Sequence, residues 1–265
     1  MRPMARRTAG AALAAKGPVE GHKLQAAERF VGKLLAAPAR ASIAKILLFG
    51  SVARGEAVAD SDVDVAVVAA GSLPSIREAC QEAALETMLE MGEDVEPLVR
   101  TLNDWREPSS WLVHRVRSEG KEVYSMDAKT IKRKEMEALY ELASMYLQAT
   151  SRLLASGAED EGSLRLAIDG GHNVIELCAK AFLLSQIDTL PKSHGGVKTL
   201  FSDHFIKTGI LPRVYGRKFS HCLQHRNEAR YDPAAEVTKE KARTVAEFAG
   251  MMTAALEKYL VGQAP

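Results

Sequence analysis

The sequence predicts an α+β domain followed by an all-α helical domain. Short apolar runs rich in β-branched residues occur at 43–49, 63–70 and 94–101, which is typical of strands. From about Lys129 onward such runs disappear, and Ala, Leu, Met and Lys recur at helical spacing. The length of 265 residues accommodates two domains of ordinary size.

The first half begins with a helix. Apolar side chains at helical spacing predict an amphipathic helix through Leu24–Leu34, which Pro38 ends. The first two apolar runs predict strands joined by a polar turn, and a helix is predicted over 75–91. The third run contains Pro97, which cannot donate to a strand ladder, so this strand is expected at a sheet edge or a bulge.

The chain is expected to divide near residues 125–130. Residues 1–22 are predicted to be a disordered tail, because their short stretch of small residues, closed by Lys16, is a poor secretion signal. The first domain is expected at 23–125 and the second at 131–261. The helices predicted in the second domain cover 131–156, 162–187, 196–206, 213–230 and 236–260.

Composition excludes several classes of protein. Hydrophobic residues at 46% exclude wholesale disorder. With 35 Lys+Arg against 34 Asp+Glu, no global field attracts the chain to nucleic acid or acidic lipid. Three widely spaced cysteines fit neither a disulfide framework nor a CxxC zinc site, so a reducing, cytoplasmic setting is expected. No apolar run approaches the ~20 residues of a membrane-spanning helix, so no membrane partner is expected.

A Gly-Ser turn follows the first predicted strand. Gly50 and Ser51 lie where that strand turns into a helix start, which leaves backbone N–H groups available to a phosphate. Glycine lets the phosphate approach the backbone closely, and Ser51 adds a hydroxyl donor. Arg54 and Ser61, in the same connection, are further candidates for binding a nucleotide, although Arg54 could equally form a surface ion pair.

Paired carboxylates follow the turn. Asp62 and Asp64 are two residues apart at the second predicted strand and are expected on one face. Two crowded carboxylates repel unless a cation lies between them, and their oxygens suit Mg²⁺ carrying nucleotide phosphates. Glu96 is the preferred third carboxylate, with Asp94 as the alternative, at the same two-residue spacing. Either motif alone is often a solvated turn or strand end, but their order along the chain favours a nucleotide and metal site.

This segment, GSVARGEAVADSDVDVAVV, resembles minimal nucleotidyltransferases of the DNA polymerase β-like superfamily. The resemblance covers roughly residues 25–124, including the closing EGKEVYS. It implies a small mixed sheet, triphosphate binding by Gly50 and Ser51, and Mg²⁺ (or Mn²⁺) held by Asp62 and Asp64. The family more often has Asp followed by apolar residues at the third position, where this chain has Glu96 followed by a proline.

The second half resembles the HEPN domain, a helical bundle often fused to or encoded beside minimal nucleotidyltransferases. The resemblance rests on AIDGGHNVIELCAKAFLLSQ, LPKSHGGVKTLFSDHFIKTGIL and CLQHRNEARYDPAAEVTKEKARTVAEFAGMM, and spans roughly 131–261. In that family an Arg followed by a His forms a ribonuclease site. Here Arg226 leads to Tyr231, so a ribonuclease is disfavoured. The alternatives are a binding site for RNA, a nucleotide or an acidic ligand, or a bundle that only forms a wall of the transferase cleft. The candidate residues of the binding site are Arg226, Asn227, Arg230 and Tyr231.

The histidines of the second half are interpreted mainly as structural. His221 and His225 lie one helical turn apart, but no third ligand is evident for zinc. His172 and His194 are expected at helix starts or in the bundle core.

The predicted reaction is transfer of a nucleoside monophosphate, AMP from ATP or from another NTP, to a hydroxyl on a protein or small molecule, with release of pyrophosphate. Glu96 is expected to assist or act as the base. The alternatives are a non-catalytic nucleotide-binding or regulatory module of toxin–antitoxin type, and a HEPN ribonuclease regulated by the first domain. A homodimer is a further possibility.

Overall fold

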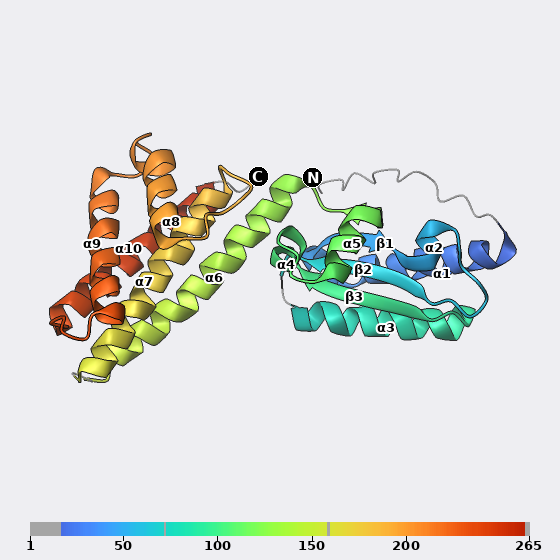
Figure 1. The fold of residues 1–265 in the computed structure, drawn as a ribbon, viewed down its shortest axis with the longest axis horizontal. Helices are drawn as coiled ribbons and strands as arrows, with labels where there is room; N and C mark the ends of the chain where they lie inside the picture. Colours follow the sequence, from blue (N-terminus) through green and yellow to red (C-terminus); the bar gives the residue numbers. More distant parts are fainter. Residues whose placement is uncertain (1–16, 72, 158–159, 263–265) are drawn as a thin grey trace. The chain divides into compact units, whose positions relative to one another are not determined.

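The computed structural model describes residues 17–71, 73–157 and 160–262, and the chain forms two compact units, Met1–Lys134 and Glu135–Pro265 (Figure 1). The boundary between the units falls inside helix α6 (Ala128–Ala155), a few residues beyond the expected linker. Most of the expected tail lies outside the described residues. Its last part is helical, contrary to the prediction, because α1 begins at Pro18, a residue well suited to the first turn of a helix.

The first unit contains a small mixed sheet, as predicted, with a fourth strand that the sequence analysis did not predict. Its strands are β1 (Ile43–Leu48), β2 (Val63–Ala69), β3 (Val95–Thr101) and β4 (Lys121–Ser125). They lie in the order β3-β2-β1-β4, with β1 antiparallel to both β2 and β4 and with β2 parallel to β3. The strand that contains Pro97 is therefore at an edge, as its sequence indicated.

Helices cover both faces of this sheet. They are α1 (Pro18–Ala36), α2 (Gly50–Arg54), α3 (Leu73–Met91), α4 (Leu102–Arg106) and α5 (Trp111–Glu119), with a 3₁₀ turn at Pro38–Ser42. Successive residues of β2 alternate between the faces. Val63 and Val65 are buried in the core formed with α1 and α3, whereas Ala66 and Val68 pack with Val116 of α5 on the opposite face. Asp64 belongs to this second face by the same alternation.

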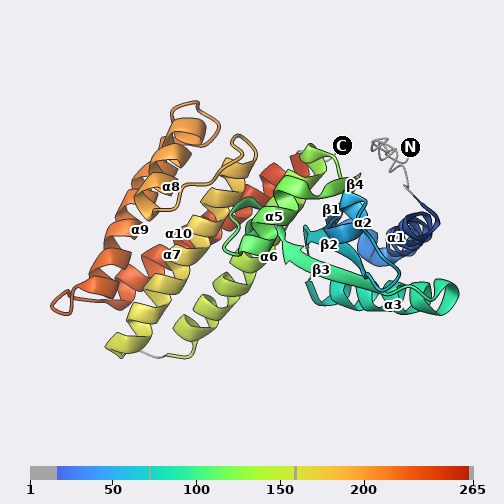
Figure 2. The same cartoon turned by 45° about the vertical axis from the view of Figure 1, so that its right-hand side comes forward.

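The second unit is a helical bundle, as predicted. Its helices after α6 are α7 (Glu161–Leu184), α8 (His194–Phe201), α9 (Arg213–Tyr231) and α10 (Lys239–Gly262). Helix α7 packs against α8, α9 and α10 (Figure 2). The helix predicted at 196–206 starts two residues earlier, and its last turn is a π-helix, η2 (Ser202–Ile206).

Aromatic rings fill the centre of the bundle. Phe182 lies 5.8 Å from Phe201 and 5.1 Å from Phe205, measured between ring centroids, and all three side chains are fully buried. Such contacts add to the free energy of burial because the edges and faces of the rings attract each other.

Cys80, Cys178 and Cys222 are free and buried. Among the helices in the described part of the chain, none is long and apolar enough to cross a membrane.

Candidate functional site

The Gly-Ser turn lies directly against the second predicted carboxylate. The Phe49 N–H donates to the Asp64 carbonyl at 3.0 Å, which joins the end of β1 to the start of β2. Gly50 has φ +70° and begins α2, and a Cβ added there would lie 1.9 Å from Asp64 Oδ2. Only glycine fits this backbone conformation and this close approach. The first N–H groups of α2 have no partner within the helix, so the turn presents donors beside a carboxylate.

Three carboxylates are brought together at the start of β2 and β3. Asp64 pairs in register with Glu96 on the neighbouring strand, and Asp62 immediately precedes β2. Burial raises the pKa of Asp64, and the negative charges of Glu96 and Asp62 raise it further, with Arg54 opposing them. A half-buried carboxylate with two like charges beside it is an environment that a cation would relieve.

The structure favours Glu96 over Asp94 as the neighbour of Asp64. Asp94 lies before β3, where its carbonyl accepts a hydrogen bond from the Val63 N–H at 2.9 Å. Asp62 and Glu96 are exposed, and the oxygens of the three carboxylates do not all lie within 4.8 Å of one another. The residues therefore suit Mg²⁺ by donor chemistry and charge, with two of the three side chains at the surface.

A buried lysine supports the loop that carries Asp62. Lys23 of α1 is 1% exposed, and its Nζ donates to the Ser61 carbonyl and to Glu93 Oε2, both at 2.6 Å. One cation thus ties the segment before β2 to the segment before β3. The sequence analysis missed Lys23, because a lysine in an amphipathic helix is normally solvated.

The other two predicted nucleotide ligands have partners within the protein. The Arg54 Nε donates to Glu56 Oε2 at 2.7 Å, which is the surface ion pair that the sequence allowed as an alternative. The Ser61 hydroxyl accepts a hydrogen bond from the Val58 N–H at 3.0 Å and helps to form the loop.

A small pocket opens beside the turn. Its volume is about 140 Å³, and helices α2 and α5 supply most of its lining, which includes Gly50, Arg54, Trp111 and Arg115. Trp111 is 72% exposed, with the Arg115 guanidinium 5.2 Å from its ring centroid. The sequence analysis identified neither of these α5 residues, because it predicted no element between 102 and 118.

The predicted ligand residues of the second half form a paired network. Arg226 is buried, and its Nε lies 3.4 Å from Asp169 Oδ1, while Arg230 also contacts Asp169 at 3.1 Å. Tyr231 is exposed, with the Arg226 guanidinium 5.2 Å from its ring. Asn227 accepts from Arg226 at 3.2 Å. The structure therefore brings all four residues together and adds Asp169, which the sequence analysis had not identified.

Comparison with known families assigns a separate family to each half. The family described as "Polymerase beta, Nucleotidyltransferase" matches residues 36–129, and the family described as "HEPN domain" matches residues 136–259. This chain belongs to both families, one in each half.

Individual proteins resemble about half of the chain. "Putative toxin MJ0142" of Methanocaldococcus jannaschii is 29% identical over 49% of this chain and 85% of its own length. "Putative toxin MJ0605" of the same organism is 30% identical over 48% of this chain and 90% of its own length. A solved structure, "Crystal structure of the toxin-antitoxin with AMP-PNP", is 27% identical over 48% of this chain and 93% of that chain, with a TM-score of 0.30.

Two histidines of the HEPN domain lie where the sequence predicted, one in the bundle core and one at a helix start. His172 is buried within α7, and His194 is the first residue of α8. Burial lowers the pKa of His172 to about 4, which keeps its ring neutral at physiological pH. The rings of His221 and His225 are tilted by 39° with their centroids 4.6 Å apart, and within the described part of the chain they belong to no group of three metal-ligating side chains.

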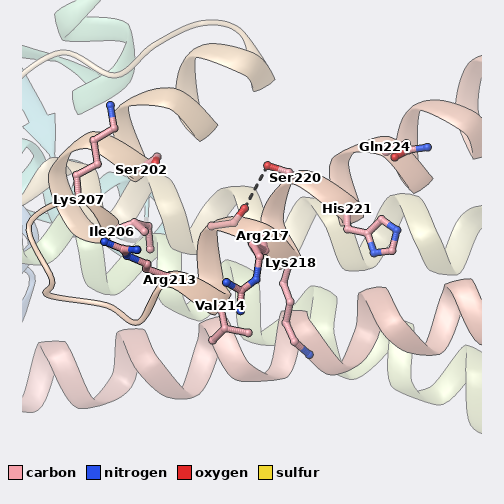
Figure 3. Close-up of a pocket in the computed structure, with 11 residues that line it drawn as sticks. Ser202, Ile206, Lys207, Arg213, Val214, Arg217, Lys218, Ser220, His221 and Gln224 are labelled. Atoms are coloured by element: carbon pink, nitrogen blue, oxygen red, sulfur yellow. Dashed lines mark hydrogen bonds between the residues drawn. The ribbon is translucent and has the colours of Figure 1, made fainter.

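The HEPN domain also carries a basic pocket. Its volume is about 970 Å³, and it lies between η2 and α9 (Figure 3). Lys207, Arg213, Arg217 and Lys218 line it together with Ser202, Ser220, His221 and Gln224, and none of the described lining residues is acidic. Basic side chains of α9 therefore line this pocket.

Proposed function

We propose that the first domain transfers the monophosphate of a nucleoside triphosphate, ATP in the simplest case, to a hydroxyl acceptor in a Mg²⁺-dependent reaction. The observation that carries this proposal is the contact of the Gly50 backbone with the Asp64 carboxylate, beside Asp62 and Glu96. Membership of the polymerase β nucleotidyltransferase family supports the same chemistry.

Each residue has a defined task in this reaction. Ser51 and the first N–H groups of α2 would donate to the phosphate oxygens. Asp62 and Asp64 would hold Mg²⁺, which supplies neutralisation of the phosphate charge. Glu96 would accept the proton of the acceptor hydroxyl. The hydroxyl oxygen would form a bond to the α-phosphorus while the bond between the α-phosphorus and pyrophosphate breaks.

The experiment is nucleotide transfer by the full chain with an α-labelled NTP and Mg²⁺. We expect Asp62→Asn with Asp64→Asn to reduce pyrophosphate release at least about 10³-fold. Asp60→Asn is the matched control, because Asp60 is an exposed carboxylate two residues before Asp62.

Two outcomes would contradict the enzyme. Equal pyrophosphate release by the wild type and the double variant, with nucleotide still bound, would favour the non-catalytic regulatory module. Equal loss in Asp60→Asn would show that the effect comes from general surface charge.

We infer that the chain acts as a toxin–antitoxin type module in the cytoplasm. The names of the two curated relatives support the first part, and three free buried cysteines support a reducing compartment. The acceptor would be a protein side chain or a small molecule. Mass spectrometry of the purified chain and of proteins captured with it tests for an added nucleoside monophosphate.

The basic pocket favours a second function, binding of RNA through its phosphates. Arg213, Arg217 and Lys218 line a pocket without an acidic residue among those described, and electrostatic contact with phosphates needs no base-specific residue. We expect Arg217→Ala with Lys218→Ala to weaken binding of single-stranded RNA about 10-fold and to reduce the salt dependence. Arg243→Ala, on α10, is the control; equal weakening there would contradict the site.

A further inference from the structure

Three side chains in the HEPN domain meet in a way that the sequence did not predict. His172 and Glu176 lie one turn apart on α7, and His194 begins α8, 18 residues further along the chain. One ligating atom from each lies within 4.8 Å of the others, and among the described residues this is the only such group of three.

His172 is unusual among the buried side chains. It is 2% exposed, and its Nε2 is buried without a hydrogen-bond partner. A buried nitrogen left without a hydrogen-bond partner destabilises the folded protein, so such atoms are rare unless something binds them. The centroid of its ring lies 5.8 Å from that of the His194 ring and 6.2 Å from that of the Phe219 ring. The His172 ring therefore has one polar and one apolar ring as neighbours.

Glu176 is held in position from both sides. Its side chain is only 10% exposed, its Oε1 accepts from Lys180 at 2.7 Å, and its Oε2 contacts His194 Nδ1. The hydrogen bond between His194 and Glu176 joins two atoms that would be ligands to a common ion. A metal ion would take the place of the proton in that bond.

We propose that His172, Glu176 and His194 bind a divalent transition metal of the Zn²⁺ class. Two imidazoles and one carboxylate are a ligand set that zinc accepts, with the fourth position left to water. The His194 side chain is 44% exposed, which gives the ion a path from solvent. Lys180 would orient the carboxylate from outside the ligand set, as hydrogen-bonded neighbours of metal ligands do.

The ion would connect two helices across a segment without regular structure. Residues 185–193 join α7 to α8, and the Ser193 hydroxyl caps α8 by accepting from the Gly196 N–H at 3.0 Å. Tying His194 to α7 would fix the end of this segment and thereby the start of α8. The proposal is independent of nucleotide transfer, which uses residues of the other unit.

The test is zinc binding by the full chain after treatment with a chelator. We expect one equivalent of Zn²⁺ to bind, Co²⁺ to give the absorption of a four-coordinate site, and saturating Zn²⁺ to raise the Tm by about 5 °C. His194→Ala and Glu176→Gln should abolish all three effects. His194 is partly exposed, so its replacement should leave the bundle folded.

Two controls separate this site from other metal-binding residues. His221→Ala removes one member of a histidine pair at the same four-residue spacing on another helix, and it should bind Zn²⁺ like the wild type. The double variant Asp62→Asn with Asp64→Asn should also still bind one equivalent of Zn²⁺. The proposal is overturned if the wild type binds no stoichiometric Zn²⁺, or if His194→Ala binds it unchanged.

Discussion

The carboxylate cluster of the first unit and the buried ion pairs of the second unit differ in how their charges are balanced. At the strand ends of the first unit, Asp64 lies beside two other carboxylates, and the pKa of Asp64 is raised because burial and these neighbours disfavour its charge. In the second unit, Arg226 and Glu176 are more deeply buried but have oppositely charged partners. Like charges that are left together indicate a cation supplied from outside, whereas paired charges stabilise the fold itself. The first arrangement is typical of a site that awaits a ligand.

The largest effect is expected at the glycine that contacts Asp64. Gly50→Ala would place a methyl group on the carboxylate and should reduce nucleotide transfer at least about 100-fold, because a shift of ~1 Å in a reacting group has effects of this size. Steady-state kinetics measures the change. Gly92→Ala is the control, since Gly92 has φ +69° but no atom within 4 Å of an added Cβ. Equal losses in both variants would mean that backbone strain, not the carboxylate, is responsible.

The second-largest effect on activity is expected at Lys23, which forms a buried ion pair with Glu93 in the first unit. We treat Lys23 as a positioning residue, and Lys23→Met should lower activity about 10-fold and raise the Mg²⁺ concentration needed for half-maximal rate. A titration of rate against Mg²⁺ separates this from a loss of folded protein. Lys33→Met, on the same helix with exposed partners Glu86 and Glu90, should leave the Mg²⁺ dependence unchanged. The same Mg²⁺ dependence in Lys23→Met as in the wild type would contradict the positioning role.

Breaking the ion pairs of the second unit should lower the free energy of unfolding. Arg226→Ala would remove a buried side chain that contacts Asp169 and Tyr231, although Asp169 would keep Arg230, and the lost packing and hydrogen bonds should lower the free energy of unfolding by about 2 kcal/mol. Arg29→Ala, which breaks an exposed pair with Glu90, should change it by less than about 0.5 kcal/mol. Urea denaturation measures both. Similar values for the two variants would remove the distinction between the halves.

The smallest expected effect is an increase in stability rather than a loss, and it concerns Asp64. The folded-state pKa of Asp64 is raised, so its charged form opposes folding at any pH above that pKa. Asp64→Asn should therefore raise the Tm at pH 7, without divalent cations, by about 1–3 °C, and the gain should shrink as the pH falls toward 3.8. Calorimetry at several pH values tests this. A lower Tm for Asp64→Asn at pH 7 would show that the carboxylate stabilises the apo fold.

The sequence predicted most elements because their patterns are local. Three strands follow from apolar β-branched runs, and the five helices of the second half follow from helical periodicity. Helices α4 and α5 were missed because LNDWR and WLVHRVRSE span only five and nine residues, which is too short for a helical pattern to repeat. The start of α1 was missed although Pro18 is a common first residue of a helix.

The candidate site was predictable only where its residues are close in sequence. Asp62 and Asp64 share one strand end, whereas the pairing of Asp64 with Glu96 appears only in the strand register of the structure. Lys23 and Asp169 could not be found, because each acquires its role from a partner more than 30 residues away. The contact of His172 with His194 likewise depends on how the chain turns between α7 and α8.

The position of β4 in the sequence affects the order in which the two domains can fold during synthesis. β1 is a central strand, but its second neighbour arrives late, because Lys45 pairs with Ser125 after 80 residues of intervening sequence. Until residue 125 leaves the ribosome, β1 has an open edge where the strand of another nascent chain could add. Once β4 is in place, the first unit has its whole sheet while most of the helical bundle is still untranslated. Synthesis from the N-terminus therefore allows the nucleotidyltransferase domain to fold first.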